Sequence, residues 1–287
     1  MAHGLERQPP DRGAVSITGG PAVVHPTAVV EPGARLAAGV RIGPWCVISA
    51  AAVIGRDTVL DNGVTIMGAV TIGARNRIYP NCVIGGEPQD VSYRGTATRV
   101  EIGDDNVIRE GVTINRASEK EDGVTSIGNA NFLMACCHVA HDCRIGDHVI
   151  IANGTLLGGH VRVQSRASLS GAVAVHHWVT IGGWSFVAGL SRVLHDVPPF
   201  MLCEGSPARP RCINVVALRR SGFDRAAIDA VTEAHRLLYR ARVGLEAARE
   251  ILRQQGMLGP HVDQLLEFLA LQQGGRHGRA REQRRAA

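Results

Sequence analysis

The sequence predicts an all-β solenoid followed by a small α-helical domain. Three features of the 287-residue chain predict it: an aliphatic residue recurs at every sixth position, glycine is frequent with 34 residues, and only 4% of the residues are aromatic. A period of six is neither the 3.6 of a helix nor the 2 of a simple strand. Three six-residue units, each with one strand and one corner, close a triangular coil, and stacked coils form a hexapeptide β-helix with a narrow interior.

The repeat covers most of the first two hundred residues. It runs without a miss from Val24 to Ile84, resumes in phase at Ile102, and continues after a slip of one residue from Ile127 to Val193. Glycine often follows the aliphatic residue directly, where it supplies corners that other residues adopt only with strain. The single aliphatic residue on each side of a coil is therefore expected to fill the core.

Interruptions of this rhythm set the expected domain boundaries. Beyond the repeat, glycine and proline become scarce and apolar residues recur at helical spacing between residues 223 and 273. We expect a flexible N-terminus at 1–21, the β-helix at 22–200 with loops at 85–100 and 115–125, a helical C-terminal domain at 201–273, and a disordered arginine-rich tail at 274–287. Loops thrown out from a solenoid often border its binding face.

Composition and charge exclude several classes of protein. The net charge is +5, but five arginines lie among the last twelve residues, so the folded body is nearly neutral and no nucleic-acid partner is expected. The seven cysteines form no CxxC pair, which favours a reduced, cytoplasmic chain. No apolar stretch approaches the length that spans a bilayer, so we expect a soluble protein without stable membrane insertion.

A cluster of histidines is the strongest candidate for chemistry, because a packed core forces any site onto the outer faces. The clustered residues are His138, His141, His160, His176 and His177. Residues 18 apart occupy one column in adjacent coils, so His141 and His177 share a column, about 9.6 Å apart, with Gly159 between them. His160 stands beside that glycine, one coil from His141.

Three interpretations of the cluster stay open. Surface histidines can simply be tolerated polar residues. An imidazole, with a reference pKa of about 6.5, suits a general base that removes a proton from a hydroxyl. Alternatively, His138 and His141 with His160 or His177 hold Zn²⁺, as in a carbonic anhydrase built on the same repeat. Gly159 favours acyl transfer, because a glycine offers its N–H to a developing oxyanion.

Several segments together resemble one enzyme family. They are the Gln89-Asp90 loop, His138-Val139-Ala140-His141-Asp142-Cys143, Gly158-Gly159-His160-Val161, Ala174-Val175-His176, Asp196-Val197-Pro198-Pro199 and Leu218-Arg219-Arg220-Ser221-Gly222-Phe223. Over roughly residues 22–270 this pattern resembles the UDP-N-acetylglucosamine 3-O-acyltransferases. The His-x-x-His-Asp-Cys segment with Asp-Val-Pro-Pro is more specific than the hexapeptide repeat, which many acyltransferases share.

The resemblance implies a fold, a reaction and partners. It implies a left-handed parallel β-helix that forms a homotrimer with active sites between subunits. The implied reaction transfers a 3-hydroxyacyl group from acyl carrier protein to the 3-hydroxyl of UDP-N-acetylglucosamine, the first committed step of lipid A synthesis, without a metal or cofactor. The carrier is acidic, and exposed arginines such as Arg162, Arg166 and Arg192 either receive it or are ordinary solvated charges.

The resemblance also implies roles for individual residues. His141 matches the general base, Asp142 the carboxylate that orients it, and Gly159 the backbone donor to the oxyanion. The substrate contacts that it implies are Asp90 to the glucosamine unit, His138, His160 and His176 near the reacting groups, Gly189 as the limit on acyl length, and Asn214 with Arg220 on the nucleotide side. His177, where the family has Gln, is expected to affect which sugar or acyl group is accepted.

Other departures from the family pattern keep rival functions open. Ser92 stands where the family has Lys, Val216 where it has Glu, and Ser221 where it has the second Arg of a pair. Losing two cationic donors should weaken contacts to an anionic nucleotide. The rivals are acylation of a 3-amino analogue of the sugar nucleotide, a γ-class carbonic anhydrase, and a binding scaffold without activity.

Overall fold

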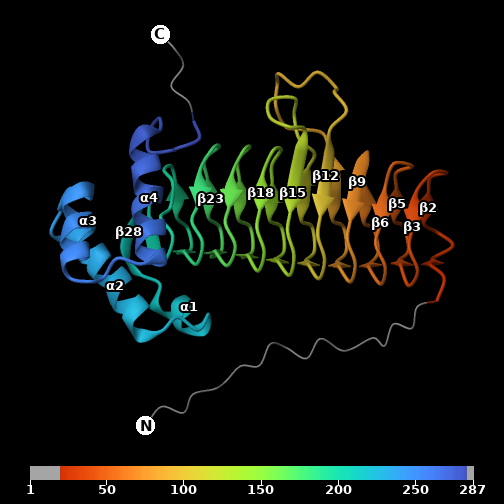
Figure 1. Ribbon diagram of the computed structural model, residues 1–287. Coiled ribbons are helices and arrows are strands. Elements are labelled where there is room, and N and C mark those ends of the chain that lie inside the picture. The colour runs from red at the N-terminus through yellow and green to blue at the C-terminus, as the bar shows by residue number, and fades with distance from the viewer. Residues whose placement is uncertain (1–19, 283–287) are drawn as a thin grey trace.

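The structure, a computed structural model that describes residues 20–282, is a three-sided prism of stacked coils with helices at its C-terminal end (Figure 1). Each coil contributes one short strand to each of three sheets, and all neighbouring strands of the coils are parallel. The flexibility expected of residues 1–19 falls outside the described part of the chain.

The three sheets are named here in the order in which the chain enters them. The first contains β1 (Val23–Val24), β4 (Arg41–Ile42), β7 (Val59–Leu60), β10 (Arg77–Ile78), β13 (Val107–Ile108), β16 (Phe132–Leu133), β19 (Ile150–Ile151), β22 (Ser168–Leu169), β25 (Phe186–Val187), β27 (Met201–Gly205) and β28 (Ala208–Ile213). The second contains β2 (Val29–Val30), β5 (Val47–Ile48), β8 (Thr65–Ile66), β11 (Val83–Gly86), β14 (Thr113–Asn115), β17 (His138–Val139), β20 (Leu156–Leu157), β23 (Ala174–Val175) and β26 (Arg192–Val193). The third contains β3 (Arg35–Leu36), β6 (Val53–Ile54), β9 (Ala69–Ile72), β12 (Arg99–Ile102), β15 (Val124–Ile127), β18 (Arg144–Ile145), β21 (Arg162–Val163) and β24 (Thr180–Ile181).

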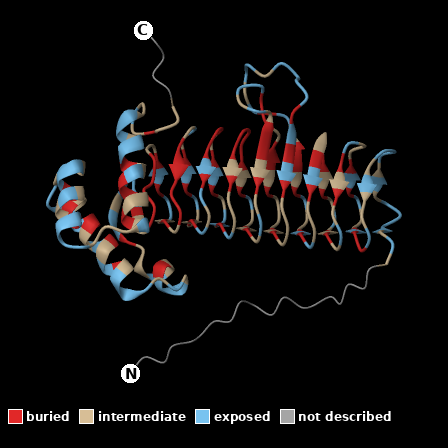
Figure 2. Cartoon of the chain, viewed as in Figure 1, coloured by how far each residue is buried: buried red, intermediate tan, exposed pale blue. Residues whose placement is uncertain are grey.

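The six-residue repeat supplies the core as predicted. In most two-residue strands the first side chain points outward and the second is buried, so buried and exposed residues alternate along the coils (Figure 2). β19 shows the contrast clearly, because Ile150 is 41% exposed and Ile151 is fully buried. The inward column is therefore a continuous stack of Val, Ile and Leu.

This packing gives a stability prediction with a matched control in the same strand. Replacing Ile151 with alanine should lower the free energy of unfolding by about 2–5 kcal/mol, since it removes buried methyl groups and leaves a cavity. Ile150→Ala should cost less than about 1 kcal/mol, because its side chain is half exposed. Denaturant unfolding of both variants measures the difference. Equal losses would show that the inward column does not carry the core.

Both loops interrupt the same corner of the prism. Ile54 pairs with Ile72, 18 positions along, whereas Ile72 pairs with Ile102, 30 along, and Ile102 pairs with Ile127, 25 along. The extra residues form a first loop at 87–98, between β11 and β12, and a second loop at 116–123, between β14 and β15. Both therefore leave where the second sheet passes to the third, and Figure 1 shows them above β12 and β15.

The C-terminal domain, expected to be helical over 201–273 with helical spacing from residue 223, begins with two strands. β27 extends the first sheet in parallel with β25, and β28 returns antiparallel to β27. This hairpin covers the sheet end that the last coil leaves unpaired, so the open edge of the solenoid explains why these residues are extended. The helices follow it: α1 (Val215–Arg220), α2 (Arg225–His235), the π-helical η1 (Arg236–Arg240), α3 (Leu245–Gln254) and α4 (Pro260–Gly274).

The expectation of a disordered tail from residue 274 is wrong for residues 274–282. Gln272 at the end of α4 donates to the Asp196 carbonyl (2.9 Å), the Asp196 N–H donates to the Gly278 carbonyl (2.8 Å), and Arg279 donates to the Leu194 carbonyl (2.7 Å). The last turn of the solenoid has no further coil to pair with, so the tail satisfies its backbone groups. Residues 283–287 lie outside the described chain. Between residues 20 and 282, no helix is both long and apolar enough to cross a membrane.

Candidate functional site

The histidines predicted from the sequence gather at one corner of the prism. We call the turns between the second and third sheets at residues 141–142, 159–160, 177–178 and 195–196 the histidine corner. The two loops arise from the same corner in the two preceding coils. The C-terminal segment 276–282 lies along this side of the prism as well (Figure 1). Loops, histidines and C-terminal segment thus surround one stretch of surface.

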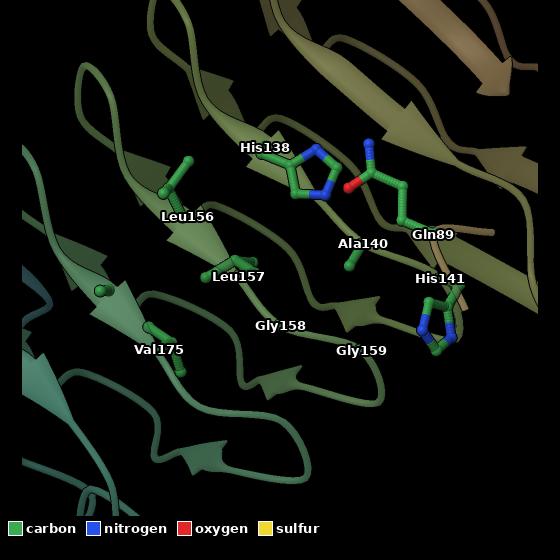
Figure 3. A pocket seen from close by; sticks show the side chains of 10 residues that line it. Gln89, His138, Ala140, His141, Leu156, Leu157, Gly158, Gly159 and Val175 are labelled. Atoms are coloured by element: carbon green, nitrogen blue, oxygen red, sulfur yellow. The ribbon is translucent and has the colours of Figure 1, made fainter. Parts of the chain in front are cut away.

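Two adjoining hollows lie at this corner. The smaller, of about 320 Å³, runs onto the second sheet and is lined by Gln89, His138, Ala140, His141, Leu156, Leu157, Gly158, Gly159, Ala174 and Val175. The larger, of about 1290 Å³, is bordered by both loops and the C-terminal segment. His141, Gly158, Gly159 and Gln89 line both. Figure 3 shows His138, His141 and the Gln89 amide on one side of the smaller hollow, with Leu156 and Leu157 toward the other.

His141 forms a dyad with the residue that follows it. His141 Nδ1 lies 2.7 Å from Asp142 Oδ2. Neighbouring side chains on a strand point to opposite faces, but Asp142 has a left-handed backbone with φ of 60°, so the corner turns its carboxylate back toward the imidazole. The carboxylate engages Nδ1, so Nε2 is the ring nitrogen of His141 that is available for a substrate. An imidazole held in this way can accept a proton at Nε2.

Asp142 is fixed from the second loop and from the neighbouring coil. It is fully buried, and it accepts hydrogen bonds from the Ser118 hydroxyl (2.7 Å) and backbone N–H, while its own N–H donates to Thr125 Oγ1 (2.9 Å). Burial alone would raise the pKa of Asp142, but the hydrogen bonds from His141 and Ser118 outweigh it, so the pKa lies below the ordinary value. Asp142 is therefore ionised at neutral pH, and this stabilising charge is lost as the pH falls through its lowered pKa.

His160 extends the buried polar group. Its ring meets His141 edge-on with centroids 5.1 Å apart and stacks on Trp178 at 4.0 Å. His160 Nδ1 lies 3.4 Å from a Glu121 carboxylate oxygen, and Nε2 lies 3.8 Å from Asp142 Oδ2. The backbone also joins the two coils here, because the His160 N–H donates to the His141 carbonyl (3.0 Å). The prediction that His160 stands one coil from His141 is thus confirmed.

Gly159 lies directly under the His141 ring. A Cβ built at Gly159 would come within 2.5 Å of His141 Cε1 and 2.6 Å of Nε2, so only a glycine permits this approach. Its carbonyl accepts from the Trp178 N–H (3.1 Å), while its own N–H donates to no acceptor in the described part of the chain. An uncommitted backbone donor beside a basic imidazole is the arrangement that stabilises a developing oxyanion.

His138 borders the smaller hollow from strand β17. His138 Nδ1 lies 2.8 Å from Thr113 Oγ1 on the preceding coil. Burial lowers the pKa of His138 and nearby His141 lowers it further, so His138 is neutral at pH 7. A neutral ring can accept a hydrogen bond from a hydroxyl in the hollow or donate one to it.

The two loops are joined to each other across the larger hollow. Asp90 in the first loop binds the ammonium of Lys120 in the second, and it accepts hydrogen bonds from the Ser92 backbone (2.9 Å) and hydroxyl (2.8 Å). The bond from Lys120 holds the pKa of Asp90 well below its usual range, with Ser92 adding to the effect. Asp90 is thus an ionised carboxylate at the rim.

The next pair of histidines lines the same hollow one coil further on. The rings of His176 and His177 lie 3.9 Å apart, and His176 Nδ1 lies 3.1 Å from the His177 carbonyl. Burial lowers the pKa of His177, with His176 as a second cause. His177 and His141 border one cavity, as their shared column predicts.

Three residues named in the sequence analysis lie away from this corner. Gly189 is at the turn between the first and second sheets. Asn214 caps α1, where its side chain donates to the Trp184 carbonyl (2.9 Å) and accepts from Ala217, and Arg220 ends that helix. In Figure 1, α1 lies on the opposite side of the prism from the loops. A single copy of the chain therefore does not bring Asn214 and Arg220 to His141.

The structure also bears on the zinc interpretation. Among the described residues, the donor atoms that cluster closely enough to be considered as metal ligands belong to His141, Asp142 and His160, within 4.8 Å of one another. This set lacks His138 and His177. His141 Nδ1 and Asp142 Oδ2 are 2.7 Å apart, whereas two ligands of tetrahedral Zn²⁺ lie about 3.3 Å apart at bond lengths near 2.0 Å. The geometry fits a proton shared between the two side chains.

Several site residues were missed by the sequence analysis. Ser118 and Glu121 lie in a loop that has no repeat to place them, and Arg281 was assigned to a disordered tail. Trp178 could have been found, because it is 18 residues beyond His160, which is itself 18 beyond Asp142. The column arithmetic that joined His141 to His177 applies equally to this neighbouring column.

Family models match both parts of the chain. A model described as UDP N-acetylglucosamine O-acyltransferase, domain 2, matches residues 196–278, and the bacterial transferase hexapeptide model matches residues 51–86 and 125–159. A Gloeothece citriformis protein named acyl-[acyl-carrier-protein]–UDP-N-acetylglucosamine O-acyltransferase is 48% identical over 206 residues, which cover 72% of this chain and 74% of the relative. A Synechocystis protein of the same name is 47% identical with the same coverage.

Solved structures agree with these relatives. The UDP-N-acetylglucosamine acyltransferase of Francisella novicida has a TM-score of 0.82 and 36% identity, covering 86% of this chain and 91% of that one. The enzyme of the same name from Campylobacter jejuni has a TM-score of 0.80 and 36% identity, covering 86% and 96%. The likeness confirms the predicted left-handed parallel β-helix with a small helical region after it.

Proposed function

This chain belongs to the UDP-N-acetylglucosamine O-acyltransferase family, and we propose that it transfers a 3-hydroxyacyl group from acyl carrier protein to the 3-hydroxyl of UDP-N-acetylglucosamine, the first step of lipid A synthesis. The observation that carries the proposal for the site is the dyad of His141 and buried Asp142 above Gly159, whose N–H donates to no acceptor among residues 20–282. These groups supply a base and an oxyanion donor for attack on a thioester.

The reaction proceeds in two proton-balanced steps. His141 Nε2 takes the proton of the sugar hydroxyl as its oxygen bonds to the thioester carbon, and Asp142 stabilises the imidazolium through Nδ1. The carbonyl oxygen becomes an oxyanion that accepts from the Gly159 N–H. As the intermediate collapses, the carbon–sulfur bond breaks and the imidazolium returns its proton to the leaving thiolate. The side chains of His141 and Asp142 and the backbone N–H of Gly159 supply each of these contacts.

The two hollows suit the two substrates. The smaller is lined mainly by aliphatic side chains and backbone of β20 and β23, which favours the acyl chain. The larger is bordered by charged and imidazole side chains, including Asp90, His160 and His176, and suits a sugar nucleotide. They meet at His141 and Gly159, where the hydroxyl and the thioester must react.

A homotrimer in the cytoplasm completes the proposed site. Asn214 and Arg220 lie on the opposite side of the prism from His141 in one copy, so a neighbouring subunit would bring them to the nucleotide. Gly189 would limit the acyl chain from the far edge of the second sheet. Among the arginines considered as contacts for acyl carrier protein, Arg162 borders the larger hollow and is the one best placed to receive it.

The test is a mass-spectrometric assay with UDP-N-acetylglucosamine and a panel of acyl-carrier-protein thioesters of graded length, with and without a 3-hydroxyl. We expect a mono-acylated sugar nucleotide from at least one donor. The absence of product from every donor would overturn the proposal.

Acylation of the 3-amino analogue is the second candidate, because two residues that differ from the family pattern, Ser92 and Ser221, form hydrogen bonds within the chain. Ser92 donates to Asp90, and the Ser221 hydroxyl accepts from Trp184 Nε1 (3.0 Å). Neither supplies the cation that the family has at that position. Competition of the two sugar nucleotides in one assay decides which acceptor has the higher kcat/KM.

The smaller hollow gives a prediction on acyl length. Ala174 projects from β23 into this hollow, so Ala174→Leu should fill part of it and shift the preferred donor to a shorter chain, with about a tenfold loss for the original donor. Ala51→Leu, an exposed alanine outside both hollows, should leave the profile unchanged. The donor panel measures both, and an unaltered profile in Ala174→Leu would place the acyl chain elsewhere.

A further inference from the structure

The C-terminal segment 276–282 forms part of the wall of the larger hollow. Four of its residues border that cavity: Arg276, Ala280, Arg281 and Glu282. The matching family model ends at residue 278, so Arg281 lies beyond it. Resting on the proposed function, we propose that Arg281 is a positioning residue. It holds the tip of the second loop, Lys120 and Glu121, over the larger hollow, where the sugar nucleotide would bind.

Arg281 makes contacts that only a guanidinium in this place can combine. Nη1 donates to the His160 carbonyl (2.6 Å), Nη2 donates to a Glu121 carboxylate oxygen (2.9 Å), and the group lies 5.3 Å from the Trp178 ring centroid. The Arg281 side chain is 15% exposed and that of Glu121 is 19% exposed. Glu121 also has Arg162 at 3.9 Å and His160 Nδ1 at 3.4 Å, but Arg281 is the one of these that donates a hydrogen bond to it at 2.9 Å. Water screens this shielded pair less than a surface pair, and removing one partner leaves the other charge poorly compensated.

The segment that carries Arg281 is itself anchored to the solenoid. The Ala280 N–H donates to Asp196 Oδ2 (2.7 Å), and Arg279 donates to the Leu194 carbonyl (2.7 Å). Asp196 also accepts from the Thr180 N–H (2.7 Å) through its other oxygen. The guanidinium of Arg281 is thus presented from a fixed backbone, as a positioning role requires.

Through Glu121, Arg281 reaches the rim of the pocket. Glu121 follows Lys120 in the chain, and Lys120 binds Asp90 of the first loop. Arg281 therefore binds Glu121, and the neighbouring Lys120 binds Asp90, so the two adjacent residues of the second loop connect the C-terminal segment to the first loop. Burial alone would raise the pKa of Glu121, but His160 and Arg281 outweigh it, so Glu121 is ionised and holds the guanidinium at neutral pH.

The second loop has a separate anchor on the catalytic side. Ser118 at its start is fully buried and bonds to Asp142. Asp122 of this loop also pairs with Arg144, and Arg162 lies 3.9 Å from the Glu121 carboxylate. Loss of Arg281 should therefore loosen Lys120 and Glu121, while Arg144 still holds Asp122 and Ser118 keeps Asp142 and His141 in place. The expected effect falls on substrate binding and not on the chemical step.

The experiment is steady-state kinetics of the full chain with UDP-N-acetylglucosamine as the varied substrate. Arg281→Ala should raise KM about tenfold, the loss typical of one charge-assisted hydrogen bond, with kcat changed less than about threefold. Glu121→Gln should raise KM similarly, and the double variant should be no worse than either single one, since both remove the same contact. Arg281→Lys should recover part of the loss, because lysine keeps the charge without the planar fork.

Two controls separate this inference from the proposed function. Arg253→Ala on α3, whose side chain is exposed and pairs with Glu250, should leave KM and kcat unchanged. Hydrogen exchange without substrate should show faster exchange at residues 119–123 in Arg281→Ala than in wild type, a readout that needs no turnover. If the wild-type protein showed no acyl transfer, the proposed function would be wrong, but hydrogen exchange at residues 119–123 would still test the contact between Arg281 and the loop. Additive effects on KM, or unchanged exchange at 119–123, would overturn the role of Arg281.

Discussion

Replacing His141 with alanine should lower kcat about 10²–10⁴-fold while the fold is kept, since one positioned general base typically contributes that much. The imidazole is the group that would take the proton of the sugar hydroxyl, and Asp142 has no other route to that proton because its carboxylate is buried and already bonded to Ser118. The ring packs on the outside of the core, so its removal leaves the inward aliphatic column untouched. KM should change little, because the larger hollow keeps its other contacts.

A second histidine of the same coil provides the control. His148 is exposed and lies at the next corner, between the third and first sheets, outside both hollows. His148→Ala should retain wild-type turnover. Both variants are assayed beside circular dichroism and thermal unfolding, which check the fold. Wild-type kcat in a folded His141→Ala variant would remove this residue from the mechanism.

Gly159→Ala should be almost as damaging, although it adds only a methyl group. The new Cβ would stand 2.5 Å from His141 Cε1, closer than real contacts allow, so the imidazole must move by about an ångström. A displacement of that size in a reacting group can cost about 10²-fold in rate. The methyl would also crowd the backbone N–H offered to the oxyanion. We expect kcat to fall at least about 10²-fold with the coils still stacked.

Gly171 is the matched control for this substitution, because it occupies the equivalent turn position at the corner between the first and second sheets. A Cβ there meets the Asn153 carbonyl oxygen at 3.5 Å, an ordinary contact. Gly171→Ala should therefore keep both stability and turnover. If Gly159→Ala turned over as fast as Gly171→Ala, the close packing of His141 on this glycine would have no part in the reaction.

The fold was predictable wherever the repeat is regular. One aliphatic residue per six-residue unit decides which side chains face inward, and the repeat positions from Ile42 to Val193 are buried as that rule requires. Those of the first coil are partly exposed because no coil precedes them in the described chain. The strands at 201–213 were not predictable in this way, because they form to cover an open sheet edge and not because of a pattern of their own. The order of residues 276–282 likewise depends on carbonyls of the last coil, which are distant in sequence.

The site residues were predictable where the stacking of coils brings together residues 18 positions apart. The 18-residue column brought His141, Gly159 and His177 together, and the structure keeps them on one hollow. The contact between His141 and Asp142 needed the left-handed backbone of Asp142, which the residue type does not announce. Glu121 and Arg281 meet from segments 160 residues apart, one of them in a loop, so no periodicity could have joined them.

In the proposed reaction, the outward column of the second sheet beside the dyad would set the length of the acyl chain. Reading from β17 to β26, its side chains are those of His138, Leu156, Ala174 and Arg192, one for every step of about 4.8 Å between paired strands. Two apolar side chains, Leu156 and Ala174, are thus followed by the charged Arg192. An acyl chain that lies along this face from the reacting carbon would be limited in steps of one strand spacing. Replacing one side chain of the column should therefore change the permitted acyl length by one step without disturbing the reaction at His141.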